Sequence, residues 1–226
     1  KMAYPTKETM PVQVVRVKDK EEISRLFVAI NKTARKPLNS NEVFVHEYLG
    51  GIQEALNTGQ TLTRCNLKVD LGTGEAGTHV GYSGGQQVKI DGFRKAVRNT
   101  SAVSVQNACS IIQSVWPDQQ TTRAEMLHGF ALLDHNTTLL SNNKHKSLFE
   151  EFLNGCKAAD VTSGKVLTTL KSEGLGKKTN FFPESVALGA LLKFKDWASA
   201  SKKIHKQTFT KHYGTYVETL QKTMGA

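Results

Sequence analysis

Apolar residues recur at helical spacing through most of the chain after Asp91, and this periodicity constrains the fold more than any other feature. Because residues three or four positions apart share one face of a helix, we expect each apolar set to be the buried face of a helix. The core residues predicted in this way are Val105, Cys109, Ile112, Trp116, Leu127, Phe130, Leu133, Phe149 and Phe152. The predicted helices are Gly92–Arg98, Val103–Val115, Thr122–Leu140, Lys144–Ala158, Gly164–Ser172, Pro183–Ala200 and His205–Thr223.

The beginning of the chain predicts a strand followed by a helix. Met10–Val17 is rich in valine and alternates weakly, which is typical of a strand. Asp19–Glu22 has the spacing of a capping box, so a helix is expected to begin there and to end before Pro37. One face of this helix is marked by Ile23, Leu26, Phe27 and Ile30.

The segment Leu62–Ile90 differs from its neighbours because it is rich in glycine between short strand-like runs such as NLKVDL, THVGY and QQVKI. We expect it to form a β-hairpin or an exposed flap. The predicted fold is α+β and mostly helical, with a strand-helix segment at 1–60, the hairpin at 61–90 and a helical domain with a basic C-terminal part at 91–226. A lone strand needs partners, which the hairpin, another chain or an upstream segment would supply.

The charge of the chain is high and unevenly distributed. The formal net charge is +10 and the pI is about 9.5. From Lys157 onward there are 12 lysines and 5 acidic residues, whereas every arginine lies at or before Arg123. This balance favours a polyanionic partner, nucleic acid first, with lysines suited to non-directional phosphate contacts and arginines to bidentate ones. The alternative is a basic surface that only keeps the protein soluble.

Other residue patterns argue against several classes of protein. The three cysteines are far apart in the sequence and lack metal spacing, so we expect reduced thiols in an intracellular, cytoplasmic protein. No apolar run is long enough to span a membrane, and the seven histidines do not have the spacing of metal ligands. Asp70, Glu75 and Asp91 could meet across the hairpin, but their spacing alone does not indicate a two-metal nuclease site. We therefore expect no metal, no cofactor and no catalytic residues.

The sequence INKTARKPLNSNE, from Ile30 to Glu42, concentrates polar and basic residues at a junction between helices. Asn39–Glu42 is a second capping box, so a helix is expected to continue from there through Val43 to Leu56 and to end at NTG. Its first backbone N–H groups form an anion site. The predicted phosphate contacts are Asn31, Lys32, Arg35, Lys36, Asn39 and Ser40. The alternative is a plain turn whose cations are solvated.

The order of these features resembles the last part of the ParB/sulfiredoxin-like domain, or ParB-like nuclease domain, of phage and plasmid proteins. The features that carry the resemblance are the run PVQVV, a helix with EEISRLFVAIN and the pattern N-x-x-x-R-x-P-L-N-x-x-E, all between Met10 and Leu56. The resemblance implies that the turn faces a nucleotide or a nucleic-acid backbone. It also implies that Asn31 orients the ligand or the turn, that Arg35 holds a phosphate and that Glu42 caps the helix, in a bacterial or phage-infected cell.

The chain departs from the pattern of that family. CTP-binding ParB proteins have the Arg three residues after the Asn, whereas Arg35 follows Asn31 by four. The family also has a D-G-x-x-R element before this strand. The similar string KIDGFR, at Lys89–Arg94, comes after it and is one residue short, so we expect no role for it. If it has one, Asp91 and Arg94 join the site.

The C-terminal part interleaves lysines with aromatic residues in KKTNFFPES, KFKDW and KKIHKQTFTKHY. Such interleaving suits base stacking, but the aromatics recur at helical spacing, so we expect them to pack inward and the lysines to face water. The predicted contacts here are Lys177, Lys178, Lys202 and Lys203. The predicted function is DNA or other nucleic-acid binding through phosphates. The alternatives are a ParB-like nuclease or nucleotide hydrolase, and a structural module that binds another protein, with a homo-oligomer or a partner chain completing the sheet.

Overall fold

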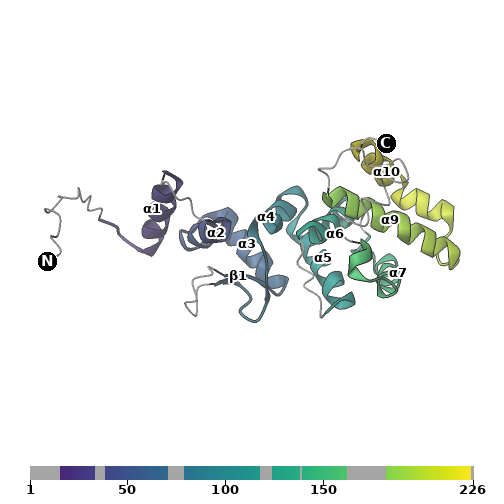
Figure 1. The fold of residues 1–226 in the computed structure, drawn as a ribbon, viewed down its shortest axis with the longest axis horizontal. Coiled ribbons are helices and arrows are strands. Elements are labelled where there is room, and N and C mark those ends of the chain that lie inside the picture. The colour runs from purple at the N-terminus through teal and green to yellow at the C-terminus, as the bar shows by residue number, and fades with distance from the viewer. Residues whose placement is uncertain are drawn as a thin grey trace, which may run out of the picture.

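The computed structural model describes residues 16–33, 39–70, 79–117, 124–137, 139–161 and 182–224 of the 226-residue chain. These residues form a mostly helical α+β fold with a small sheet, which confirms the predicted fold class. Figure 1 shows α1 (Lys20–Thr33) at one end of the longest axis and α9 (Phe182–Ala200) and α10 (Lys206–Met224) toward the other. In these ranges, no helix has both the length and the apolar character needed to cross a membrane.

The first helix begins and ends where the sequence predicts. Asp19 precedes α1, and its Oδ1 accepts a hydrogen bond from the backbone N–H of Glu22 at 2.8 Å. This is half of the predicted capping box, since the Glu22 carboxylate accepts from the N–H of Lys18 rather than of Asp19. The helix ends at Thr33, before Pro37 as predicted. Most of the strand predicted at Met10–Val17 lies outside the described residues.

The single helix predicted from Val43 to Leu56 is wrong, because the structure has two helices there. They are α2 (Ser40–Leu49) and α3 (Gln53–Arg64). Gly50 ends α2, and Gly51 has a φ of 68°, in the left-handed region that glycine adopts easily and that ends helices. The sequence NTG, predicted to end the helix, lies inside α3 instead.

The glycine-rich segment forms a three-stranded sheet rather than a simple hairpin. Its strands are β1 (Leu67–Asp70), β2 (His79–Gly81) and β3 (Gln86–Gln87), in the order β2-β1-β3. The antiparallel pair β1–β2 confirms part of the predicted hairpin, whereas β3 lies parallel to β1 on its other edge. Gly81 has a φ of 112°, and a Cβ there would lie 2.3 Å from the carbonyl oxygen of Leu67, so this position requires glycine.

The helices predicted after Asp91 are confirmed within the described residues, although those predicted to end at Leu140 and Ala158 end at Thr137 and Asn154. The helix predicted at Gly164–Ser172 lies outside the described residues. The other elements in this part are α4 (Ile90–Asn99), α5 (Ala102–Val115), α6 (Ala124–Thr137), α7 (Asn143–Asn154) and the short 3-10 helix η1 (Ala158–Val161), followed by α9 and α10.

All nine core residues predicted from the helical spacing are buried. They belong to a hydrophobic core that runs from Phe44 in α2 to Leu220 in α10. Helices α6 and α9 approach closely within it. A Cβ on Gly129 would lie 2.8 Å from the carbonyl oxygen of Pro183 and from side-chain atoms of Val186, so only glycine fits between these helices.

Aromatic rings from α7, α9 and α10 form a cluster inside the helical part. The Phe194 ring centroid lies 5.1 Å from that of Phe149 and 6.0 Å from that of Trp197. Phe209 and Tyr213 of α10 join the cluster, with their ring centroids 4.8 Å apart. Phe194, Phe209 and Tyr213 are buried, which confirms that these tail aromatics pack inward.

Two of the three cysteines, which are distant in the sequence, are neighbours in the fold. Cys65 follows α3 and Cys109 lies in α5, and both are buried free thiols. Their hydrogen bond, together with burial, raises the pKa of the Cys109 thiol well above its usual value. Cys156 is half-buried, and burial also raises the pKa of its thiol.

Candidate functional site

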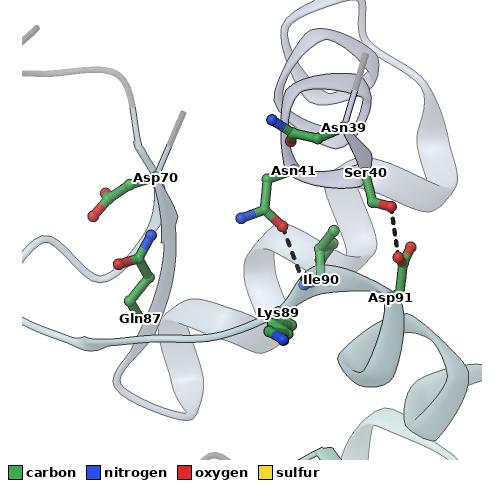
Figure 2. A pocket seen from close by; sticks show the side chains of 8 residues that line it. All are labelled: Asn39, Ser40, Asn41, Asp70, Gln87, Lys89, Ile90 and Asp91. Atoms are coloured by element: carbon green, nitrogen blue, oxygen red, sulfur yellow. Dashed lines mark hydrogen bonds between the residues drawn. The ribbon is translucent and has the colours of Figure 1, made fainter. Parts of the chain in front are cut away.

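A polar hollow lies where α2 and α4 begin, beside strands β1 and β3 (Figure 2). Its volume is about 310 Å³. Seven of the eight residues that line it have polar or charged side chains: Asn39, Ser40, Asn41, Asp70, Gln87, Lys89 and Asp91, with Ile90 as the eighth. Two of the residues predicted to contact phosphate, Asn39 and Ser40, therefore lie at this hollow.

The second predicted capping box is confirmed and builds one wall of the hollow. The side-chain oxygen of Asn39 accepts a hydrogen bond from the Glu42 backbone N–H at 3.0 Å. In return, the Glu42 carboxylate accepts from the Asn39 backbone N–H at 2.9 Å. These bonds satisfy two N–H groups at the start of α2 and hold the turn in place.

Hydrogen bonds between side chains and backbone join the starts of α2 and α4, which are far apart in the sequence. Ser40 Oγ donates to Asp91 Oδ2 at 2.5 Å, and the backbone N–H of Ile90 donates to Asn41 Oδ1 at 3.3 Å. Figure 2 shows both contacts on one side of the hollow. The string KIDGFR thus supplies Asp91 to the turn that carries Asn39, although its spacing predicted no role.

Arg94, the second residue of KIDGFR that could have joined the site, does not line the hollow. Its guanidinium makes ion pairs with Glu47, at 2.8 Å, and with Glu54, and it lies over the Phe44 ring at 5.6 Å from the centroid. The Arg94 side chain is only 15% exposed. These contacts connect α4 to α2 and α3, so Arg94 has a structural role.

The charges of the hollow do not by themselves favour a phosphate. Its lining includes two carboxylates, Asp70 and Asp91, and one ammonium group, that of Lys89. Asp91 is engaged by Ser40, and Asp70 pairs with Lys68 at 3.3 Å. In this structure the cations needed to balance a phosphate would have to come from Lys89 and from residues outside the hollow.

The same two carboxylates bear on metal binding. Asp70 and Asp91 line one hollow, whereas Glu75 lies outside the described residues. Figure 2 shows the Asp70 carboxylate directed away from Asp91. Within the described part of the chain, no group of three or more His, Cys, Asp or Glu residues is arranged to hold a metal ion.

The residues predicted to contact phosphate do not lie together. Some lie at the hollow, some at the turn between α9 and α10 and some at the end of α1, and the rest lie outside the described residues. Asn39 and Ser40 lie at the hollow, whereas Lys202 and Lys203 lie in the turn between α9 and α10, toward the other end of the molecule (Figure 1). Asn31 and Lys32 stand in the last turn of α1, and the structure does not describe their side chains. The remaining predicted contacts, which lie outside the described residues, are Arg35, Lys36, Lys177 and Lys178.

Exposed lysines gather around the turn between α9 and α10. Lys203 pairs with Glu151 of α7, and its ammonium lies 5.1 Å from the centroid of the Trp197 ring. Lys202 has a φ of 54° in this turn. Ile204 of the same segment is buried, whereas Lys202, Lys206 and Lys211 are exposed. We call the four exposed lysines Lys202, Lys203, Lys206 and Lys211 the lysine surface.

A histidine pair lies between α7 and α10. Tyr213 Oη is 2.5 Å from His145 Nδ1, and the His145 and His212 ring centroids are 5.1 Å apart. Burial lowers the pKa of His145, and the charges of His212 and Lys144 lower it further. Burial also raises the pKa of Tyr213 above its usual range. His145 therefore favours its neutral form in the folded protein.

Several of these groups are not predictable from local sequence patterns, for a common reason. Asp91 meets Ser40 across 51 positions, and His145 meets Tyr213 across 68. No local spacing signals such contacts. The string KIDGFR was a usable signal for Asp91, and Lys206 and Lys211 stand in the same lysine-rich tail as the predicted lysines.

Comparison with protein-family models, with curated proteins and with solved structures found no match for this chain.

Proposed function

We propose that this protein binds nucleic acid by contacting backbone phosphates, mainly through the lysine surface. The supporting observation is that the lysines around the α9–α10 turn are exposed while the aromatic residues between them are buried. Such a surface attracts a polyanion, and it has no exposed rings from Phe194, Phe209 or Tyr213 on which bases could stack. The proposed contacts are therefore largely independent of base sequence.

The net charge of +10 supports this proposal. The contacts of two arginines favour lysines as the residues that bind phosphate. Arg94 is held by Glu47 and Glu54 and is mostly buried. Arg25 donates from Nε to the Gly50 carbonyl oxygen at 2.8 Å. These two arginines stabilise the fold, whereas the exposed lysines of the lysine surface lie together in one turn and the start of α10, which suits contact with a phosphate backbone.

The basic turn predicted from the sequence is a second part of the proposal. Lys32, Arg35 and Lys36 precede Asn39 and Ser40, which line the polar hollow. Cations there would offset the carboxylates of Asp70 and Asp91. The nuclease or nucleotide-hydrolase alternative gains no support from the hollow, because these two acids are engaged by Lys68 and Ser40.

The proposal is tested by fluorescence anisotropy with labelled double-stranded and single-stranded DNA, from about 50 to about 200 mM salt. The slope of log affinity against log salt should fall by about 1 for each lysine that contacts a phosphate. Loss of the same number of charges outside the lysine surface should leave most of this salt dependence unchanged. The test variant combines Lys202→Gln, Lys206→Gln and Lys211→Gln, and the control combines Lys18→Gln, Lys20→Gln and Lys95→Gln, all at exposed positions.

A separate variant, Arg35→Ala, measures how much the basic turn contributes to the affinity for DNA. A loss of affinity and slope in Arg35→Ala, in addition to that of the lysine triple variant, supports both regions as contacts. No effect of Arg35→Ala restricts binding to the lysine surface. No binding by the wild type at low salt, or equal losses in the two triple variants, would overturn the proposal.

A further inference from the structure

Large apolar side chains that remain exposed gather at the end of the molecule where α1 lies. The described residues include eight such side chains. Three of them belong to α1, one lies just before α1, and two lie at the corner between α2 and α3. Figure 1 shows this end opposite to α9 and α10. We call the six residues Val17, Ile23, Phe27, Ile30, Leu49 and Ile52 the α1 end.

Helix α1 has an apolar stripe that its contact with α2 leaves exposed. Its buried side chains are Ser24 and Val28. Ile23, Phe27 and Ile30 lie on another side of the helix, and they are 50%, 39% and 56% exposed. The Phe27 ring still contacts α2, since its centroid is 4.1 Å from that of the His46 ring. The stripe is therefore anchored to the fold but faces water over about half of its surface.

The corner between α2 and α3 adjoins α1. The Arg25 Nε of α1 donates to the carbonyl oxygen of Gly50 in this corner. A hollow of about 390 Å³ lies between the same elements and gives this end a concave part. Its lining is made of Arg25, Val28, Ala29, His46, Glu47 and Ile52.

We propose that the α1 end binds a second copy of this chain and forms a two-fold dimer. The exposed parts of the six side chains amount to apolar surface on the order of 450 Å². An interface of standard size buries about 800 Å² per partner, of which roughly 450 Å² is nonpolar. The α1 end thus carries about the nonpolar surface that one side of such an interface needs, and it is as large as the largest apolar patches on monomers, which are often functional.

The arrangement of α1 suits pairing with itself. Phe27 lies near the middle of the stripe, with Ile23 four residues before it and Ile30 three after it. In an antiparallel two-fold pair, Phe27 packs against its own copy and Ile23 against Ile30 of the second copy. The acidic residues Glu21 and Glu22 in the first turn of one helix then lie beside the last turn of the other, where Lys32 stands.

This dimer is independent of nucleic-acid binding by the lysine surface, although Lys32 of the basic turn belongs to α1. The lysine surface lies toward the opposite end of the molecule (Figure 1), so pairing through the α1 end leaves it exposed in both copies. An apolar interface is also weakened little by salt, whereas phosphate contacts are weakened strongly. The two proposals can therefore fail separately.

The test is sedimentation equilibrium of the full chain, freed of nucleic acid, from low micromolar to near-millimolar concentration. Wild type should show a monomer–dimer equilibrium, and Phe27→Asp should weaken it at least about tenfold. The control is Val103→Asp, which places the same charge at an apolar side chain 63% exposed on α5, away from the α1 end. It should dimerise like wild type, and circular dichroism checks that both variants fold.

A cross-linking experiment tests whether position 27 lies beside its own copy in the dimer, and it introduces no charge into the apolar surface. Phe27→Cys should form a disulfide-linked dimer under mild oxidation faster than Val103→Cys or the wild type, whose Cys65 and Cys109 are buried and whose Cys156 is half-buried. A wild type that stays monomeric at all concentrations would overturn the proposal. So would a dimer that Phe27→Asp leaves intact, or a monomer in which another segment of the chain protects the α1 amides from hydrogen exchange.

Discussion

The two ends of the molecule use similar amphipathic helices in opposite ways. At one end, α10 buries Phe209 and Tyr213 in the aromatic cluster and turns its lysines to water. At the other end, Ser24 and Val28 are the buried residues among the described side chains of α1, and the apolar stripe stays exposed. Both helices have a clear apolar face. Whether that face is buried depends on how many neighbours pack around the helix, which is why one end suits a charged ligand and the other an apolar partner.

The largest test of this comparison removes one aromatic ring from each end. Phe194→Ala should lower the free energy of unfolding by about 3 to 5 kcal/mol, because Phe194 is fully buried among aromatic rings of α7, α9 and α10. Phe27→Ala should lower it by about 1 kcal/mol or less at concentrations where the chain is monomeric, since Phe27 is 39% exposed. Urea unfolding measures both values. Equal losses would mean that α1 is packed as tightly as α9.

A smaller effect is expected from the ion pairs that join α4 to α2 and α3, between the two ends of the molecule. Arg94→Gln should destabilise the fold by about 2 kcal/mol, because it leaves Glu47 partly buried without its cation and breaks the contact of α4 with α2 and α3. Arg98→Gln is the control. Its side chain is 58% exposed and pairs with Glu54 at 3.3 Å, so the expected loss is within about 0.5 kcal/mol. Similar losses in the two variants would show that the Arg94 ion pairs do not stabilise the contact of α4 with α2 and α3.

The smallest effect concerns pH and the contact of α7 with α10. The pKa of His145 is lowered in the folded state, so the unfolded state binds the proton first as the pH falls below about 6.5. Stability should therefore decrease from about pH 7.5 to about pH 5.5. His145→Phe should reduce this decrease without abolishing it, because burial also lowers the pKa values of His46 and His128.

Urea unfolding at the two pH values measures the difference. The control is His205→Gln at an exposed position, which should keep the pH dependence of the wild type. The groups that face His145 are Tyr213, His212 and Lys144. If His145→Phe leaves the pH dependence unchanged, the Tyr213–His145 contact does not control protonation at this end.

The sequence predicted the candidate site only where local signals exist. Asn39 and Glu42 form the predicted capping box because their spacing alone places both groups at a helix start. The inward packing of Phe209 and Tyr213 also follows from helical spacing. The polar hollow was not predicted as a whole, because Asp70, Gln87 and Lys89 reach it from the sheet and from α4.

Composition and spacing thus determined the mostly helical fold, the two helix starts at Asp19 and Asn39, the core residues and the basic charge of the C-terminal part. These properties depend on neighbours within one or two helical turns. Only the tertiary structure decided that Ser40 meets Asp91, that Cys65 meets Cys109 and that the stripe of α1 stays exposed. Such contacts join residues dozens of positions apart, and they depend on how whole elements pack rather than on any local pattern.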